Sequence, residues 1–107
     1  MINSVVIVGR AGQDPDMKYF ESGKVKTTFS VAVGRWSKEG EKTDWFSIEL
    51  WDKNAEFAGE YVKKGKLVAL DGKLAISKWT DASGETKERY FIRVNNIRLL
   101  GSKREEA

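Results

Sequence analysis

The sequence has no cysteine and no histidine, and it has one proline among 107 residues. Without cysteine there can be no disulfide, no thiolate metal site and no thiol nucleophile. Without histidine the commonest general base and the commonest nitrogen ligand of zinc are missing. Carboxylates and carbonyl groups remain as metal ligands, but they show no EF-hand spacing. The sequence therefore predicts no metal or other cofactor, and it argues against an enzyme.

Long apolar runs are also missing. No stretch approaches the roughly 20 apolar residues that span a bilayer, and residues 1–4 lack the basic-then-apolar order of a signal peptide. We therefore expect an intracellular protein. The formal net charge of +3 is compatible with a polyanionic partner. The chain length suits one domain with a single core.

The strongest pattern that is present is period-two alternation of apolar and polar residues, which is typical of strands. It predicts strands over residues 4–8, 24–36, 44–53, 67–79 and 87–100, with a brief resumption of the first strand at 17–20. On the last two long strands, the inward parity includes Leu74, Ile76 and Tyr90. The phase then slips near Asn95 and Asn96, which predicts a β-bulge.

One segment, residues 52–64, changes to a helical period. Asp52 is the expected N-cap and Gly65 is expected just after the end of the helix. Five strands with one helix between the third and fourth predict an all-β protein, a five-stranded Greek-key barrel of the OB type. We expect this OB-fold domain to cover residues 1–101, followed by a short polar end at 102–107.

The four tryptophans share an unusual placement. Trp36, Trp45, Trp51 and Trp79 all fall on the polar parity of their strands, opposite the predicted core residues. Large flat rings on an open sheet face can stack unpaired bases. Purely structural roles stay open beside this one: Trp45 and Trp51 would pack under the loop at 37–42 or between subunits, and Trp36 and Trp79 would clamp turns.

Basic residues accompany these rings. The candidates for phosphate contacts are Arg35, Lys53, Lys73 and Lys78. Rings and cations together predict binding of single strands with little base selectivity, because a duplex hides its base faces. The alternatives are a single-stranded RNA-binding or primosome-associated OB protein, a carbohydrate-binding module, and an enzyme using carboxylates such as Asp44, Glu49 and Asp71.

Three segments carry a resemblance to a known family. VVIVGRAGQDPDMKY, TDWFSIELWDKNAEFAGEYVKKG and SKWTDASGETKERY closely resemble the bacterial single-stranded DNA-binding protein family, and the similarity runs from about residue 4 to about residue 101. Membership would imply an OB-fold that assembles as a homotetramer and coats single-stranded DNA in replication, recombination and repair. It would place the protein at the nucleoid of a bacterium or in an organelle of bacterial origin. The stacking aromatics of the family fall on Trp36, Trp45, Trp51 and Trp79.

The two ends of the chain carry further expectations. Members of the family usually continue into a disordered linker with an acidic tip that recruits partner enzymes, whereas this sequence stops at Arg104-Glu105-Glu106-Ala107. The resemblance therefore gives no basis for partner recruitment through such a tail. Near the start, residues 4–8 are apolar on both faces, which predicts that this strand pairs subunits; the alternative is a covering loop from the same chain.

Overall fold

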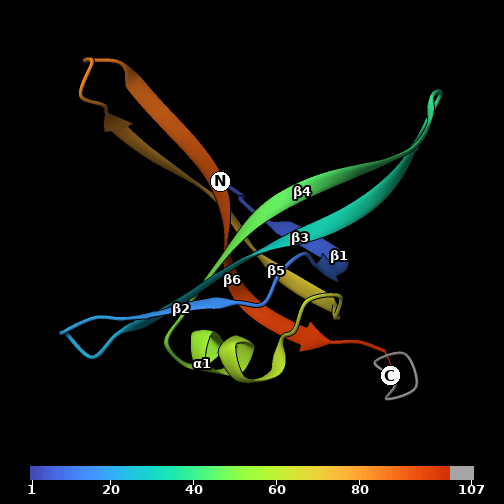
Figure 1. Cartoon of the computed structure of the whole chain (residues 1–107), viewed down its shortest axis with the longest axis horizontal. Coiled ribbons are helices and arrows are strands. Elements are labelled where there is room, and N and C mark those ends of the chain that lie inside the picture. The colour runs from blue at the N-terminus through green and yellow to red at the C-terminus, as the bar shows by residue number, and fades with distance from the viewer. Residues whose placement is uncertain (102–107) are drawn as a thin grey trace.

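The computed structural model describes residues 1–101, which form six strands and one helix (Figure 1). In chain order they are β1 (Val5–Ala11), β2 (Asp16–Tyr19), β3 (Val25–Ser37), β4 (Gly40–Trp51), α1 (Asp52–Tyr61), β5 (Leu67–Thr80) and β6 (Thr86–Leu99). The polar end predicted at 102–107 lies outside the described residues. Within residues 1–101, no helix combines the length and the apolar character needed to cross a membrane.

The strands form one sheet that closes on itself. Its order is β1-β5-β6-β4-β3-β2, and an additional pairing of β1 with β3 closes the barrel. That closure uses two register pairs, Arg10 with Ala32 and Ala11 with Val31. The short strand β2 only extends the edge of β3, so β1, β3, β4, β5 and β6 make the barrel. The predicted five-stranded OB-type barrel is confirmed.

The core lies inside this barrel and under the helix. Ile48 and Leu50 of β4 are fully buried, as their parity predicted, and α1 contributes Ala55 and Ala58 to the same cluster. The buried hydroxyl of Thr27 donates a hydrogen bond of 2.7 Å to the Ala55 carbonyl. This bond ties β3 to the helix and satisfies a polar group that would otherwise be costly to bury. The helix therefore plugs one end of the barrel.

The start of the helix differs from the prediction. Trp51 is the N-cap residue, and no side chain caps the helix. Asp52 has a φ of 52°, and its carboxylate accepts a hydrogen bond of 3.4 Å from the Val25 N–H. The N-cap prediction for Asp52 is wrong because its side chain reaches the start of β3. The helix ends at Tyr61, so Gly65 does not follow it directly as predicted. Gly65 instead lies in the loop to β5, where its φ is 89°.

Two pairs of strands extend beyond the barrel as two-stranded ribbons (Figure 1). The β3–β4 ribbon pairs as far as Ser37 with Gly40, and the β5–β6 ribbon as far as Thr80 with Thr86. Leu74, Ile76 and Tyr90 lie on the second ribbon and are 44%, 50% and 52% exposed. The prediction that these three face the core is wrong, because in the described chain no second layer lies opposite this part of the ribbon.

A β-bulge lies at the base of the β5–β6 ribbon. Asp71 pairs with Asn96 and Gly72 pairs with Val94, so Asn95 is the extra residue of β6. The predicted bulge is confirmed. It lets Ile92 and Val94 enter the core on the same side as Ile97 and Leu99, although the two pairs differ in sequence parity.

Candidate nucleic-acid interface

The outer side of the β3–β4 pair carries three of the four tryptophans. The register places Trp51 opposite Lys26, Trp45 opposite Ala32, and Trp36 opposite Glu41. Residues directly opposite each other on paired strands face the same side of a sheet. Trp45 is 61% exposed and Trp36 is 82% exposed. We call this side of the sheet, continued onto β6 and β5, the tryptophan face.

The tryptophan face continues across β6 and β5. In the parallel pairing of β4 with β6, Glu49 lies beside Arg93. From there, four pairs follow the ribbon on the same side: Arg93 with Lys73, Phe91 with Ala75, Arg89 with Ser77, and Lys87 with Trp79. Trp79 is 48% exposed. All four tryptophans therefore lie on one side of one continuous sheet.

Trp45 rests on the loop that follows β1. A Cβ atom added to Gly12 would collide with the six-membered ring of this indole, so the ring packs directly against the Gly12 backbone. Gly12 is itself fixed, because its N–H donates to the Ser30 carbonyl at 2.8 Å. The loop thus supports the ring while leaving most of it open to solvent.

Trp51 is more buried than the other three tryptophans and belongs to a cluster. Its ring stacks on Phe20 with centroids 5.7 Å apart and planes 25° apart. The Lys26 ammonium lies 5.8 Å from the Trp51 ring centroid, and the Lys18 ammonium lies 5.2 Å from that of Phe20. The indole N–H donates a hydrogen bond to the Glu49 carboxylate. Trp51 is therefore more constrained than the other three tryptophans.

Sequence reasoning missed Phe91, Arg89 and Arg93. Phe91 is 7% exposed but lies outside the core cluster. Its ring has the Arg89 guanidinium 5.4 Å from the centroid and the Arg93 guanidinium 5.7 Å from it. The alternation of Lys87, Arg89, Phe91 and Arg93, opposite in parity to Ile92, could have revealed this row. Phe20 was placed at the end of the predicted strand 17–20 and its contact with Trp51 was missed, whereas β2 ends at Tyr19 and Phe20 begins the following turn.

The four predicted cations divide into two groups. Lys73 lies on the tryptophan face, and Lys53 is exposed on α1 two residues after Trp51. Arg35 lies on the opposite side of its ribbon, where its Nε donates to both oxygens of Asp44 at 2.9 and 3.0 Å. Lys78 also lies opposite the tryptophans, paired across the ribbon with Glu88. The structure does not bring Arg35 and Lys78 to the tryptophan face, and their binding roles stay predictions.

The three carboxylates considered for an enzyme have separate partners. Asp44 pairs with Arg35, Glu49 accepts from Trp51 and Arg93, and Asp71 accepts from the Asn96 amide at 3.1 Å. In residues 1–101, no group of three or more aspartate or glutamate side chains is placed to hold a metal ion.

The turn that ends the β5–β6 ribbon is organised by Asp81. Its carboxylate accepts hydrogen bonds from the Ser83 hydroxyl at 2.6 Å, the Ser83 N–H at 2.9 Å and the Glu85 N–H at 3.0 Å. The bond from the Ser83 hydroxyl is the main cause that lowers the pKa of Asp81 below its ordinary value of 3.8. Trp79 therefore lies close to a turn whose conformation is fixed by the hydrogen bonds of Asp81.

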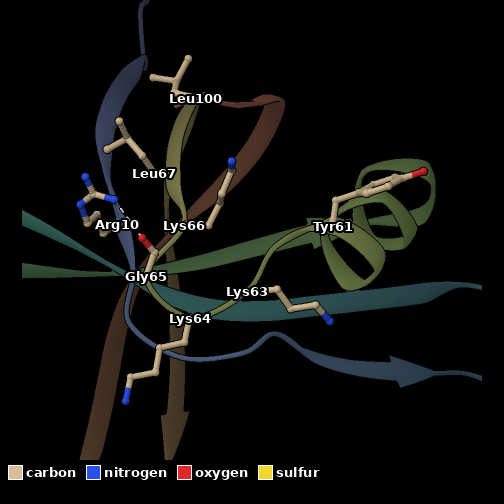
Figure 2. Close-up of a pocket in the computed structure, with 8 residues that line it drawn as sticks. All are labelled: Arg10, Tyr61, Lys63, Lys64, Gly65, Lys66, Leu67 and Leu100. Atoms are coloured by element: carbon tan, nitrogen blue, oxygen red, sulfur yellow. Dashed lines mark hydrogen bonds between the residues drawn. The ribbon is translucent and has the colours of Figure 1, made fainter. Parts of the chain in front are cut away.

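A pocket at the junction of β1, α1 and β5 lies apart from the tryptophans. It is lined by Arg10, Tyr61, Lys63, Lys64, Gly65, Lys66, Leu67 and Leu100. Figure 2 shows Lys63 and Lys64 extending away from each other, while Arg10 donates to the Gly65 carbonyl at 3.0 Å. The cations do not converge on one point, so this pocket has no built anion site.

Comparison with known proteins gives a consistent result. A family model described as the single-strand binding protein family matches residues 2–100. Single-stranded DNA-binding protein 1 of Synechocystis sp. is 53% identical over 108 residues, which cover 99% of this chain and 89% of that protein. A protein of the same name from Nostoc sp. is 51% identical over 105 residues, covering 97% of this chain and 87% of that protein.

A solved structure has the same fold. It is described as a Plasmodium falciparum SSB complex with single-stranded DNA, and it superimposes with a TM-score of 0.86 at 28% identity. The superposition covers 94% of this chain and 96% of that one. The likeness therefore extends over the barrel, the helix and the strands that carry the four tryptophans.

Proposed function

Because this chain belongs to the single-strand binding protein family, we propose that it binds and coats single-stranded DNA with little base selectivity. The observation that carries the proposal is the exposure of Trp36, Trp45 and Trp79 on one side of one sheet. Each base has a π-face, so stacking tolerates any sequence, and it contributes about 1–3 kcal/mol per base. Paired bases in a duplex cannot offer those faces. The proposal involves no catalytic step.

Cations on the tryptophan face and on the adjoining helix supply the second part of the mechanism. We assign phosphate contacts to Lys73 and Lys53, as the sequence predicted, and add Lys87, Arg89 and Arg93 from their positions across from β5. Neutralising phosphates releases counterions, so the affinity for a single strand falls with salt by about 0.7 log units per log unit of salt for each contact. Stacking and phosphate contacts together hold the strand without reading its sequence.

The exposed side of β1 supports assembly, and we propose a homotetramer. Val6 is 74% exposed and Val8 is 50% exposed. Within the described chain, residues 5–8 pair only with β5, so their other edge is open. An open edge with exposed valines suits pairing with a second copy. Coating in replication, recombination and repair at a bacterial nucleoid follows from the family, and it is part of the proposal.

The test is a titration of the intrinsic tryptophan fluorescence with oligo-dT, run alongside light scattering to obtain the mass. We expect quenching on binding, a strong salt dependence, and a mass near four chains. Trp45→Ala should weaken binding by about 1–3 kcal/mol. Tyr61→Ala is the matched control, because Tyr61 is 52% exposed on α1, off the tryptophan face.

Three results would count against parts of this proposal. Absence of quenching by oligo-dT at low salt would contradict the binding of single-stranded DNA. Tighter binding of rU than of dT oligomers in direct competition would replace DNA by RNA as the ligand. Equal affinities of the Trp45→Ala and Tyr61→Ala proteins would show that Trp45 is a structural ring.

A further inference from the structure

Glu49 is a buried carboxylate on the tryptophan face. It lies on β4 between Ser47 and Trp51 and is 7% exposed, and the only other buried polar side chain within residues 1–101 is Thr27. A carboxylate is expensive to remove from water unless donors surround it. Glu49 also lies beside the rings proposed to stack DNA bases, and its negative charge would repel the phosphates. A structural role would explain why it is there.

Two donors from different strands meet at one oxygen of Glu49. The Trp51 indole N–H donates to Oε1 from the same strand, and the Arg93 guanidinium donates to the same oxygen at 3.4 Å from β6. Trp51 is in turn stacked on Phe20, and Arg93 lies over the Phe91 ring. Glu49 thus links the two aromatic clusters of the face.

We propose that Glu49 is a positioning residue that holds the Trp51 ring and the Arg93 guanidinium in the arrangement that receives the strand. This inference rests on the proposed function. A hydrogen bond to the indole edge fixes the rotation of the ring, while Phe20 fixes it from one face. Ordering a mobile side chain on binding costs affinity, and a ring that is already ordered avoids that cost.

The proposal makes Glu49 and the indole N–H a functional pair. A phenyl ring at position 51 could still stack, but it has no N–H to donate. Glu49 would then keep only Arg93 as a partner, and its positioning role toward the ring would be lost. The effect of replacing Glu49 should therefore depend on which ring occupies position 51.

The experiment is a double-mutant cycle on oligo-dT affinity with Glu49→Leu, Trp51→Phe and the double variant. Glu49→Leu alone should weaken binding by about 2- to 12-fold, the cost of ordering one side chain. In the Trp51→Phe background it should weaken binding less, because only the positioning of Arg93 is then lost. Loss of the negative charge favours binding in both backgrounds, so the cycle cancels that contribution.

Two further variants separate hydrogen bonding from charge. Glu49→Gln keeps an oxygen that accepts from the indole N–H, so its affinity should stay within about twofold of the wild type or rise. This variant also keeps the test alive if Glu49→Leu fails to fold. Glu56→Gln removes one carboxylate from the exposed side of α1, and it should leave the affinity unchanged.

A readout without DNA separates a failure of this inference from a failure of the proposed function. The Trp51 indole N–H resonance should move strongly in Glu49→Leu and little in Glu49→Gln. Equal weakening by Glu49→Leu in both backgrounds, or an unmoved resonance, would overturn the proposal that Glu49 positions the Trp51 ring. Failure of the wild type to bind oligo-dT would instead overturn the proposed function, and the resonance would still decide whether Glu49 orders the ring.

Discussion

The closed end of the barrel and the two projecting ribbons are built from the same alternating strands, yet they use their apolar side chains differently. On β5 the residues Val68, Leu70, Leu74 and Ile76 share one parity, but the first two are 0% and 3% exposed and the last two are 44% and 50% exposed. Parity decides which side a residue faces. Burial requires a second layer on that side, and α1 and the far wall of the barrel provide it only at the closed end.

The largest expected effect contrasts these two regions directly. Leu50→Ala should lower the free energy of unfolding by about 2–5 kcal/mol, because it opens a cavity in a packed core. Ile76→Ala on the ribbon should change it by no more than about 0.5 kcal/mol. Chemical denaturation followed by circular dichroism measures both values. A loss at Ile76 as large as that at Leu50 would break the comparison and show that something covers this side of the ribbon.

A smaller effect is expected where the barrel supports the ribbon. Gly12→Ala should weaken oligo-dT binding by about 1 kcal/mol, part of the stacking energy of one base, because the added methyl group displaces the Trp45 ring. Gly34→Ala is the control on the same ribbon, since its Cβ would lie 3.4 Å from the nearest oxygen, in ordinary contact. Unchanged binding by the Gly12 variant would show that Trp45 does not need this support.

The two sides of the β5–β6 ribbon should respond differently to salt. Arg89→Ala should reduce the slope of log affinity against log salt by about 0.7, which corresponds to one lost phosphate contact. Lys78→Ala should leave the slope unchanged, because Lys78 lies on the other side of the ribbon. A reduced slope for Lys78→Ala would restore its predicted role and place DNA on both sides.

The smallest effect concerns the turn at Asp81. The pKa of this carboxyl is lowered, so the stability that it gives to the turn is present above the ordinary value of 3.8 and is lost as the pH falls through the lower folded value. Amide resonances of Ser83 and Glu85 should shift in that acidic range, and Asp81→Ala should abolish the shift. The barrel should remain folded through the same change, whereas simultaneous loss of barrel signals would contradict the separation of the two regions.

The sequence was a good guide wherever one side of a strand faces a filled interior. Ile48 and Leu50 were assigned correctly, and the phase slip identified the bulge at Asn95. Leu74, Ile76 and Tyr90 could not be assigned correctly, because alternation continues along a ribbon after the opposing layer has ended. The sequence pattern contains no signal for that boundary.

The tryptophan face was predicted in part. The parity of Trp45, Trp36 and Trp79 agrees with their exposure, and the stacking role remains a proposal. Phe20 and Glu49 were not recognised as partners of Trp51, because contacts between a turn, a strand and a neighbouring strand depend on three-dimensional register. The N-cap prediction for Asp52 was wrong for the same reason. Its carboxylate accepts a hydrogen bond from the Val25 N–H of β3, a contact that depends on the three-dimensional fold.

The extra residue at Asn95 shifts the register of β6 by one residue, so the residues before and after it reach the same side of the sheet with opposite sequence parity. Suppose that the bulge were absent and that Ile97 and Leu99 stayed in the core. Every residue of β6 between the bulge and the tip of the ribbon would then face the other side of the sheet. Arg93 would then point toward the apolar interior, Arg89 would leave the tryptophan face, and Ile92 would point toward water. The presence of Arg89 and Arg93 on the tryptophan face thus depends on one uncharged asparagine at the base of the ribbon.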